Sequence, residues 1–280
     1  MNNDLWSMIV DLELDFLTEV IGLDSLHFGI WEDHEPESLE YLDRAQNRYT
    51  QKLASFIPEE VEAILDVGSG MGDNARYLTG KGYRVTAISP TESHRRFYED
   101  GLAGLEFHCT GIEDFTSDCT YDLILMSESS NYFSYQEAFE KFETLLKPGG
   151  YVLVSGLFKK KETELFQRKH RYDEYLAWAQ GSGYEILDDE DITQSVLKTL
   201  TVGRNGLIYV QKTLTLLDRY SDRFKSSVRG MLVFNIGKLL AGNSPEMIFK
   251  ALDDLLYLYD EDMFQEYITY RIILFRKNHL

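Results

Sequence analysis

The chain has 280 residues, of which 44% are hydrophobic and 27% are charged. This is enough for a sizeable core in one large α/β domain with an added lid or a small subdomain. The 47 acidic residues outnumber the 28 basic ones, and the formal net charge is −19. A polyanion would be repelled at long range, so we expect no nucleic-acid partner.

The first residues, Met-Asn-Asn-Asp, lack the basic region of a signal peptide. The longest apolar stretches, at 231–236 and 248–258, are too short or too charged to span a bilayer. Cys109 and Cys119 have neither metal-ligand spacing nor the pattern of a disulfide framework. We therefore expect a cytoplasmic protein without stable membrane insertion.

Residues 1–58 predict an N-terminal helical cap. Leu5, Met8, Ile9 and Leu12 fall at helical spacing, and a second helix is expected at about 38–56, before Pro58. Between the two helices, residues 26–33 lack helical periodicity.

From residue 59 the pattern changes to short apolar or β-branched runs that alternate with amphipathic stretches. The strand candidates are residues 63–67, 84–88, 105–109, 123–126 and 151–154. This alternation predicts right-handed βαβ units and a parallel sheet.

The rest of the chain adds a charged helix at about 161–180, a strand at 184–187, a mostly helical part and a last strand at 267–275. We predict an α/β fold with a doubly wound, mostly parallel seven-stranded sheet, N-terminal helices and a helical lid inserted before the last strand. The core then comprises 59–192 and 263–280, and the lid or acceptor subdomain comprises 193–262.

The most informative segment is residues 64–75, in which an apolar strand leads into Gly68, Gly70 and Gly72 before a helix begins. Glycines allow a sharp turn and the close approach of a ligand, and the helix N-terminus favours a negative group. A dinucleotide fingerprint requires Gly-x-Gly-x-x-Gly, and a P-loop requires Gly-Lys-Ser/Thr. A plain tight turn is the remaining alternative, but the strand before and the helix after favour a ligand loop.

Residues 66–72, Asp-Val-Gly-Ser-Gly-Met-Gly, resemble motif I of class I S-adenosylmethionine-dependent methyltransferases. The resemblance is good over about residues 20–155 and looser elsewhere. It implies that S-adenosylmethionine is the methyl donor. It also implies that the backbone of Gly68, Ser69, Gly70 and Gly72 wraps the methionine part, while Asp66 organises the loop and the amino group.

Residues 26–31, Leu-His-Phe-Gly-Ile-Trp, resemble a segment that folds over the donor in one group of these enzymes. The group contains cyclopropane-fatty-acid synthases, tocopherol and sterol C-methyltransferases, and sugar O-methyltransferases of antibiotic pathways. Ser89 stands where many class I enzymes carry an acid for ribose. His94 aligns with a Gln of the group and is either a ribose or adenine contact or a helix-surface residue.

Residues 111–115, Gly-Ile-Glu-Asp-Phe, resemble the adenine-binding stretch of cyclopropane synthases. The resemblance implies that Gly111, Ile112 and Glu113 lie beside the adenine ring. Ser127, at the end of the fourth strand, is expected among the donor-binding residues.

Residues 127–133, Ser-Glu-Ser-Ser-Asn-Tyr-Phe, end the fourth strand, beyond which this fold binds ligands. The tocopherol and sterol enzymes share Glu128, but here Asn131 and Tyr132 replace their Glu and His. The catalytic candidates are Glu128, Tyr132 and His27. Each has a structural alternative: a bond to loop backbone for Glu128, core packing for Tyr132, and a structural pin for His27.

Three functions remain open at this point. The first is methyl transfer to an O, N or C atom of a small-molecule acceptor, a metabolite or natural product. The second is a cyclopropane-synthase-like enzyme acting on lipids, which residues 26–31 and 111–115 favour and which Asn131 and the net charge oppose. The third is a donor-binding protein without catalysis.

We expect the first function, without a metal, because no cluster of His, Asp or Glu has ligand spacing. The Tyr-rich C-terminal part suits a bulky acceptor pocket, or else a helix–helix or homodimer seam. Its tyrosines include Tyr209, Tyr220, Tyr257 and Tyr259.

Overall fold

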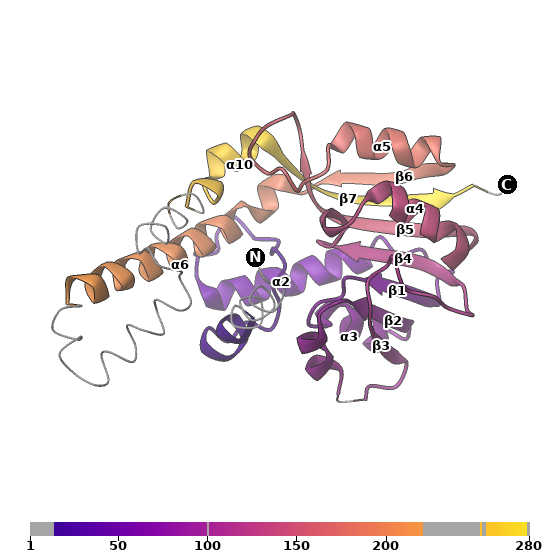
Figure 1. Ribbon diagram of the computed structural model, residues 1–280, viewed down its shortest axis with the longest axis horizontal. Coiled ribbons are helices and arrows are strands. Elements are labelled where there is room, and N and C mark those ends of the chain that lie inside the picture. Colours follow the sequence, from indigo (N-terminus) through magenta and orange to yellow (C-terminus); the bar gives the residue numbers. More distant parts are fainter. Residues whose placement is uncertain (1–13, 100, 221–252, 254–255, 279–280) are drawn as a thin grey trace.

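The chain forms a single seven-stranded sheet with helices on both faces (Figure 1). The structure is a computed structural model that describes residues 14–99, 101–220, 253 and 256–278. The strand order is β3-β2-β1-β4-β5-β7-β6. The strands are β1 (Ala63–Val67), β2 (Arg84–Ser89), β3 (Leu105–Cys109), β4 (Tyr121–Ser127), β5 (Leu146–Lys159), β6 (Tyr184–Asp191) and β7 (Ile268–Lys277).

The five strands from β1 to β5 are parallel, and β7 runs antiparallel to both β5 and β6. The predicted doubly wound, mostly parallel seven-stranded α/β fold is therefore confirmed. The helices are α2 (Leu39–Ala54), α3 (Asp73–Gly80), α4 (Tyr135–Leu145), α5 (Tyr172–Gly181), α6 (Thr193–Arg219) and α10 (Glu261–Tyr267). Shorter helical turns are η1 (Phe16–Val20), η2 (Glu92–Tyr98) and η3 (Ser130–Tyr132).

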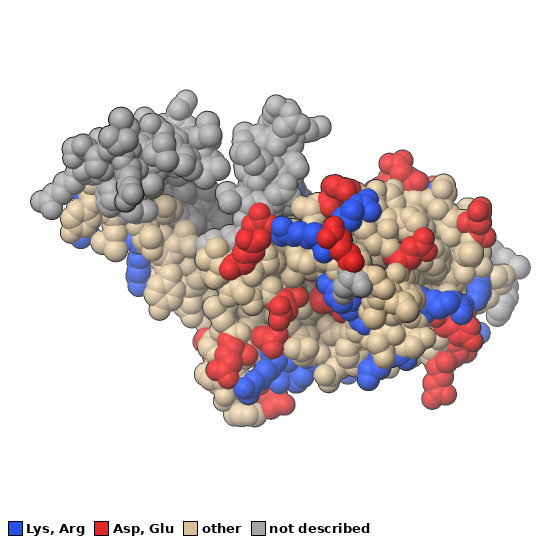
Figure 2. Space-filling view, turned by 90° about the horizontal axis from the view of Figure 1, so that it is seen from below, with Lys and Arg blue, Asp and Glu red and all other residues tan. Residues whose placement is uncertain are grey.

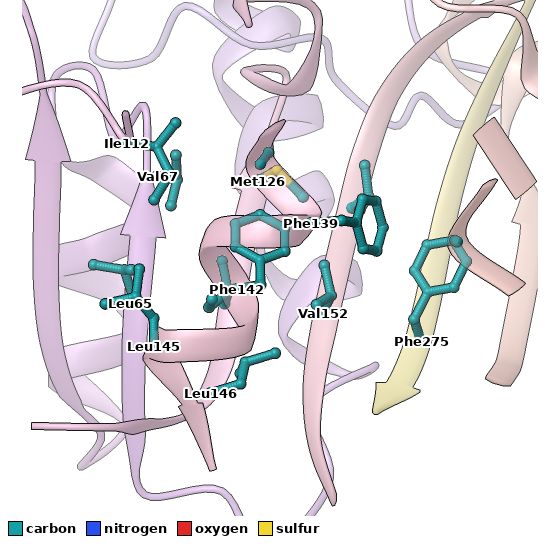
Figure 3. Packing of buried hydrophobic residues seen from close by; sticks show 14 of the residues in the cluster. Leu65, Val67, Ile112, Met126, Phe139, Phe142, Leu145, Leu146, Val152 and Phe275 are labelled. Carbon is teal, nitrogen blue, oxygen red and sulfur yellow. The ribbon is translucent and has the colours of Figure 1, made fainter. Parts of the chain in front are cut away.

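Alternation along the strands creates two cores. On one face, Leu65 and Val67 of β1 pack with Phe139 and Phe142 of α4 and with α5 (Figure 3). On the other face, Ile64 packs beneath α2, α3 and the start of α6. Because a central parallel strand is buried on both faces, its residues read as a continuous apolar run rather than an alternating one.

The helix expected at about 161–180 is wrong in its first half, because α5 begins only at Tyr172. Phe166 has a left-handed φ of 55°, which is incompatible with a continuing α-helix. The segment of residues 160–171 is instead tied to its neighbours, since the Lys159 N–H donates to the His170 carbonyl at 2.8 Å. We call residues 160–171 the crossing loop.

The boundaries of the predicted cap, core and lid remain predictions. The expected first helix lies largely in residues 1–13, outside the described residues. Of the expected lid, α6 and α10 are helical, and residues 221–252 lie outside the described part. Within the residues that the structure describes, no helix is long and apolar enough to cross a membrane. Acidic and basic side chains are interspersed on the face shown in Figure 2.

Residues 26–31, here called the aromatic segment, are held between α2 and α6. The Ile30 N–H donates to the Ala45 carbonyl of α2, and the Trp31 N–H donates to the Ser195 carbonyl of α6, both at 2.9 Å. A Cβ on Gly29 would lie only 2.5 Å from the Ala45 Cβ and 2.8 Å from its carbonyl carbon. This backbone contact therefore requires a glycine.

We expect Gly29→Ala to lower the free energy of unfolding by about 1–3 kcal/mol, because the new methyl group overlaps main-chain atoms of α2. Gly80→Ala is the matched control, since a Cβ there meets nothing within 4 Å. The control should be neutral or stabilising by up to about 1 kcal/mol. Urea unfolding of both variants measures the difference, and equal stability would contradict the proposed close approach.

Candidate functional site

A cavity of about 370 Å³ opens at the carboxyl ends of β1, β2 and β4. Its size is within the roughly 300–1,000 Å³ typical of small-molecule sites. All of the predicted site residues line it except Gly72 and His94. Those that line it are His27, Asp66, Gly68, Ser69, Gly70, Ser89, Gly111, Ile112, Glu113, Ser127, Glu128 and Tyr132.

The glycine loop after β1 has left-handed backbone at Gly68 and Gly70, with φ of 74° and 55°. The Gly68 and Ser69 N–H groups donate to the Ile88 carbonyl of β2 at 2.9 and 3.1 Å. A Cβ on Gly68 would lie 2.4 Å from the Ser129 Cβ, whereas one on Gly70 would meet nothing within 4 Å. Gly68 thus packs the loop against the end of β4, and Gly70 leaves open space beside the cavity.

Gly72 lies behind the cavity, as the left-handed N-cap of α3. A Cβ there would come within 2.7 Å of the Tyr98 ring. The Tyr98 hydroxyl donates to Ser69 Oγ at 2.7 Å, and its ring stacks on Phe107 with centroids 4.3 Å apart. Tyr98 therefore supports the glycine loop from outside, a contact that no sequence motif indicated.

His94 also lies outside the cavity lining, next to Ser89. Its Nδ1 is 2.8 Å from Ser89 Oγ. Ser89 itself is buried and lines the cavity. His94 is therefore placed to orient the Ser89 hydroxyl.

Asp66 is a buried acid at the end of β1, facing the cavity. Burial, together with the nearby charge of Asp73, raises the pKa of Asp66 to about 8. Among the described residues, its Oδ2 has no hydrogen-bond partner. A buried carboxylate oxygen without a donor is costly, so a ligand that brings an N–H or ammonium group would stabilise it.

His27 is buried in the aromatic segment and paired with Asp73 of α3. Its Nε2 lies 2.8 Å from Asp73 Oδ2, and its Nδ1 lies 2.7 Å from the Phe28 carbonyl. Burial opposes the imidazolium, but the bond and charge of Asp73, with the charge of Glu128, raise the pKa of His27 overall. With an acceptor beside each ring nitrogen, the geometry suits the doubly protonated ring.

Glu128 follows β4 in a left-handed conformation, with φ of 58°. Its Oε1 accepts the Phe28 N–H at 2.7 Å and the Tyr270 hydroxyl at 2.5 Å. Burial raises the pKa of Glu128, although the charge of His27 and these two donors act in the opposite direction. The partner on β7, Tyr270, comes 142 residues later in the chain and was not predicted as a site residue.

Ser127 joins a hydrogen-bonded group beneath the cavity. The buried Tyr49 hydroxyl lies 2.9 Å from Ser127 Oγ and donates to Ser155 Oγ at 2.8 Å. Tyr49 thus connects α2 with the ends of β4 and β5.

Tyr132 is 79% exposed at the rim of the cavity, so the core-packing alternative for it is wrong. Its neighbour Asn131 has a structural role. The Asn131 amide nitrogen donates to the Leu157 carbonyl, and its oxygen accepts the His170 N–H, both at 2.9 Å. Asn131 therefore anchors the crossing loop to β5.

The cavity lining is acidic. It contains the carboxyl groups of Asp66, Asp73, Glu113 and Glu128, and the described residues that line it include no Lys or Arg. His27 is the one imidazole in this lining. In the described part of the chain, no three or more His, Cys, Asp or Glu side chains are grouped to hold a metal.

The tyrosines of the C-terminal part lie elsewhere. Tyr209, Tyr220 and Tyr257 are exposed, and Tyr259 packs closely on Gly203 of α6. None of the four is among the described residues that line the cavity. Their expected role in an acceptor pocket or a homodimer seam remains a prediction.

Comparison with known proteins places these features in a family. A family model described as "Methyltransferase domain" matches residues 39–185. A probable chloroplastic tocopherol O-methyltransferase of Oryza sativa subsp. japonica is 26% identical over 152 residues, covering 49% of this chain and 42% of the relative. The chain therefore spans less than half of that relative's length.

A second curated relative and a solved structure agree with this assignment. A ubiquinone biosynthesis O-methyltransferase of Rickettsia bellii (strain OSU 85-389) is 24% identical over 200 residues, covering 65% of this chain and 77% of the relative. The crystal structure of the [4+2]-cyclase SpnF superposes with a TM-score of 0.71 at 22% identity, covering 97% of this chain and 94% of that one. At this identity the superposition shows the fold alone.

The His27–Asp73 pair predicts a pH-dependent contribution to stability. Because the folded pKa of His27 is raised, the contribution is complete below the unfolded value of about 6.5 and is lost as the pH rises through the folded pKa. We expect His27→Gln to lower the free energy of unfolding by about 1.5–3 kcal/mol at pH 6 and by less at pH 9. Urea unfolding at both pH values measures this cost.

His34→Gln is the control, because the His34 side chain is 79% exposed. Its effect on the free energy of unfolding should be small at both pH values. A cost of His27→Gln that stays constant or grows with pH would contradict the charged pair.

Proposed function

The chain belongs to the class I S-adenosylmethionine-dependent methyltransferases, and from this premise we propose that it methylates a hydroxyl or amine group of a small, neutral or cationic acceptor. S-adenosylmethionine supplies an electrophilic methyl group from its sulfonium. The observation that carries the proposal is the acidic cavity lining, in which the carboxylate of Glu128 and the glycine loop line the same cavity.

The residues of the cavity fit this donor. The left-handed glycine loop leaves its backbone open to a ligand at Gly70, and the unpartnered Asp66 Oδ2 suits an ammonium group. We propose that Ser89, Gly111, Ile112 and Glu113 hold the nucleoside part and that Ser127 lies near the methionine part. Since the donor carries a net positive charge, an acidic lining favours its binding.

Glu128 is the proposed general base. Burial raises the pKa of Glu128, and a carboxylate with a raised pKa is a stronger acceptor for the proton of a hydroxyl or ammonium group. Its backbone and one carboxylate oxygen are already bonded within the protein, so the group is held in place before the acceptor arrives. Alignment of acceptor and donor accounts for much of the rate in such a displacement.

The acceptor class follows from the same lining. Carboxylates without a Lys or Arg among the described lining residues would repel a phosphorylated acceptor. Leu26 and Tyr132, which are 44% and 79% exposed, both line the cavity and offer apolar surface to the body of an acceptor. These features support a neutral or amine-containing molecule with an apolar part.

A cyclopropane-synthase-like reaction on lipids is less well supported. The resemblance to cyclopropane synthases implies that the position of Asn131 carries, in those enzymes, a Glu that helps to hold bicarbonate. Here both ends of the Asn131 amide are used to anchor the crossing loop. A titration with the donor product and a panel of acceptors distinguish the proposed methyl transfer from donor binding without transfer.

We expect the wild-type protein to bind S-adenosylhomocysteine in a calorimetric titration and Gly70→Arg to bind none, because the side chain enters the open space beside the cavity. Gly82→Arg is the control, since Gly82 is an exposed glycine with φ of 100° outside the cavity lining. Each substitution should cost about 1–3 kcal/mol of backbone strain, but only Gly70→Arg should abolish binding. Equal binding of S-adenosylhomocysteine by both variants would contradict the assignment of the donor site to the glycine loop.

We expect release of S-adenosylhomocysteine with members of a panel of phenols, alcohols and amines, and none with their phosphorylated counterparts. Glu128→Gln should lower kcat by about 10²–10⁴-fold because the base is lost, while the affinity for S-adenosylhomocysteine stays within a few-fold. Turnover confined to phosphorylated acceptors, or a fully active Glu128→Gln, would contradict the assignment. Donor binding without turnover across the panel would favour the non-catalytic alternative.

A further inference from the structure

Glu128 is held by three segments that are far apart in the sequence. Its own N–H donates to the Ser155 carbonyl of β5 at 2.7 Å, which fixes the strained left-handed backbone. Its Oε1 accepts the Phe28 N–H of the aromatic segment and the Tyr270 hydroxyl of β7. Among the described residues, both hydrogen bonds of the carboxylate are made by Oε1, so Oε2 is the oxygen left for a ligand.

The Tyr270 hydroxyl has two neighbours that compete for its single proton. Glu128 Oε1 lies 2.5 Å away, and the Tyr49 hydroxyl lies 3.2 Å away. The shorter contact, to a carboxylate, is the stronger one, so the proton points to Glu128. Tyr270 is fully buried, and its ring packs on Phe28 with centroids 5.4 Å apart.

Charged and titratable groups face Glu128 from every element packed around it. His27 comes from the aromatic segment, Tyr49 from α2, Lys169 from the crossing loop and Tyr270 from β7. His27 and Lys169 act on Glu128 through charge, whereas Tyr270 donates a hydrogen bond to it. Tyr270 and the Phe28 N–H are therefore the two donors that hold Oε1, and Tyr270 is the one of the two that donates from a side chain.

We propose that Tyr270 is a positioning residue for methyl transfer, whose hydroxyl holds Oε1 of Glu128 so that Oε2 is presented to the proton of the acceptor. The inference rests on the proposed function of Glu128 as the base. It gives the last strand a part in the site although β7 contributes no residue to the cavity lining. Loss of the hydroxyl removes a donor to the charged carboxylate, and the pKa of Glu128 must then rise.

Tyr175 provides a matched control for this proposal. It is as fully buried as Tyr270 but lies in the core on the other face of the sheet. No side-chain hydrogen bond of its hydroxyl is found in the described part of the chain. Tyr175→Phe removes the same atom from a buried site without touching Glu128.

The test is a carbon-13 NMR titration of the protein labelled at the glutamate side-chain carboxyl carbon and saturated with S-adenosylhomocysteine. Glu128→Gln identifies the Glu128 signal. We expect Tyr270→Phe to raise the Glu128 midpoint by about one pH unit, as befits the loss of a hydrogen bond to a charged group. Tyr175→Phe should leave the midpoint where it is in the wild type.

An unchanged midpoint in Tyr270→Phe, or an equal shift in both variants, would overturn the proposal. Should Tyr270→Phe fail to fold, the wild type labelled at the tyrosine ring carbon that bears the hydroxyl serves instead. The Tyr270 signal must then titrate with the same midpoint as Glu128, and a signal that does not respond would overturn the proposal. Both measurements need no acceptor, so they are independent of whether methyl transfer is found.

Discussion

A carboxylate that is withdrawn from water needs a hydrogen-bond donor or a cation beside it. Three carboxyl groups of this kind meet near the ends of β1 and β4. Asp73 forms an ion pair with His27, and Glu128 accepts hydrogen bonds from Tyr270 and the Phe28 N–H. Asp66 receives no such partner for its Oδ2 from the described residues. The segments around the cavity bring these hydrogen-bond donors to it. Asp66 itself lines the cavity, where we propose that the cationic methyl donor binds.

The aromatic segment is the part of the chain on which this pairing depends most. It supplies the imidazole for Asp73 and the backbone N–H for Glu128 from adjacent residues. Its position follows from the contact of Gly29 with Ala45 and from Thr199 of α6, whose Oγ1 accepts the Trp31 indole N–H at 2.9 Å. Packing, backbone bonds and charge pairing therefore all require the same placement of this segment.

The parts of the site that could be predicted are those in which neighbouring residues act together. The glycine loop is one example, because strand, turn and helix follow one another within a dozen residues and each has its own sequence signal. Tyr98 and Tyr270 could not be found in this way, since each acts through a contact with a remote segment and neither belongs to a local pattern. Charge patterning was misleading at residues 160–171, where anchoring by Asn131 outweighs local helix propensity.

The sheet also contains a strand end that the local sequence does not predict. Residues 188–191 are acidic and poor strand formers, yet they extend β6 beyond its predicted end. Pairing with β7 explains this, because Arg271 of β7 contacts Asp189 at 2.7 Å and Asp191 at 3.0 Å. A strand can thus be stabilised by a partner that its own sequence does not reveal.

The strand order carries a consequence for how the molecule is made. Among the described strands, β7 comes last along the chain, yet it lies between β5 and β6. On the ribosome, the glycine loop and the parallel strands emerge first. The Tyr270 hydroxyl that donates to Glu128 is synthesised 142 residues after it. A nascent chain can therefore form the glycine loop long before its proposed base is oriented, so that the proposed site is completed only when β7 closes the sheet.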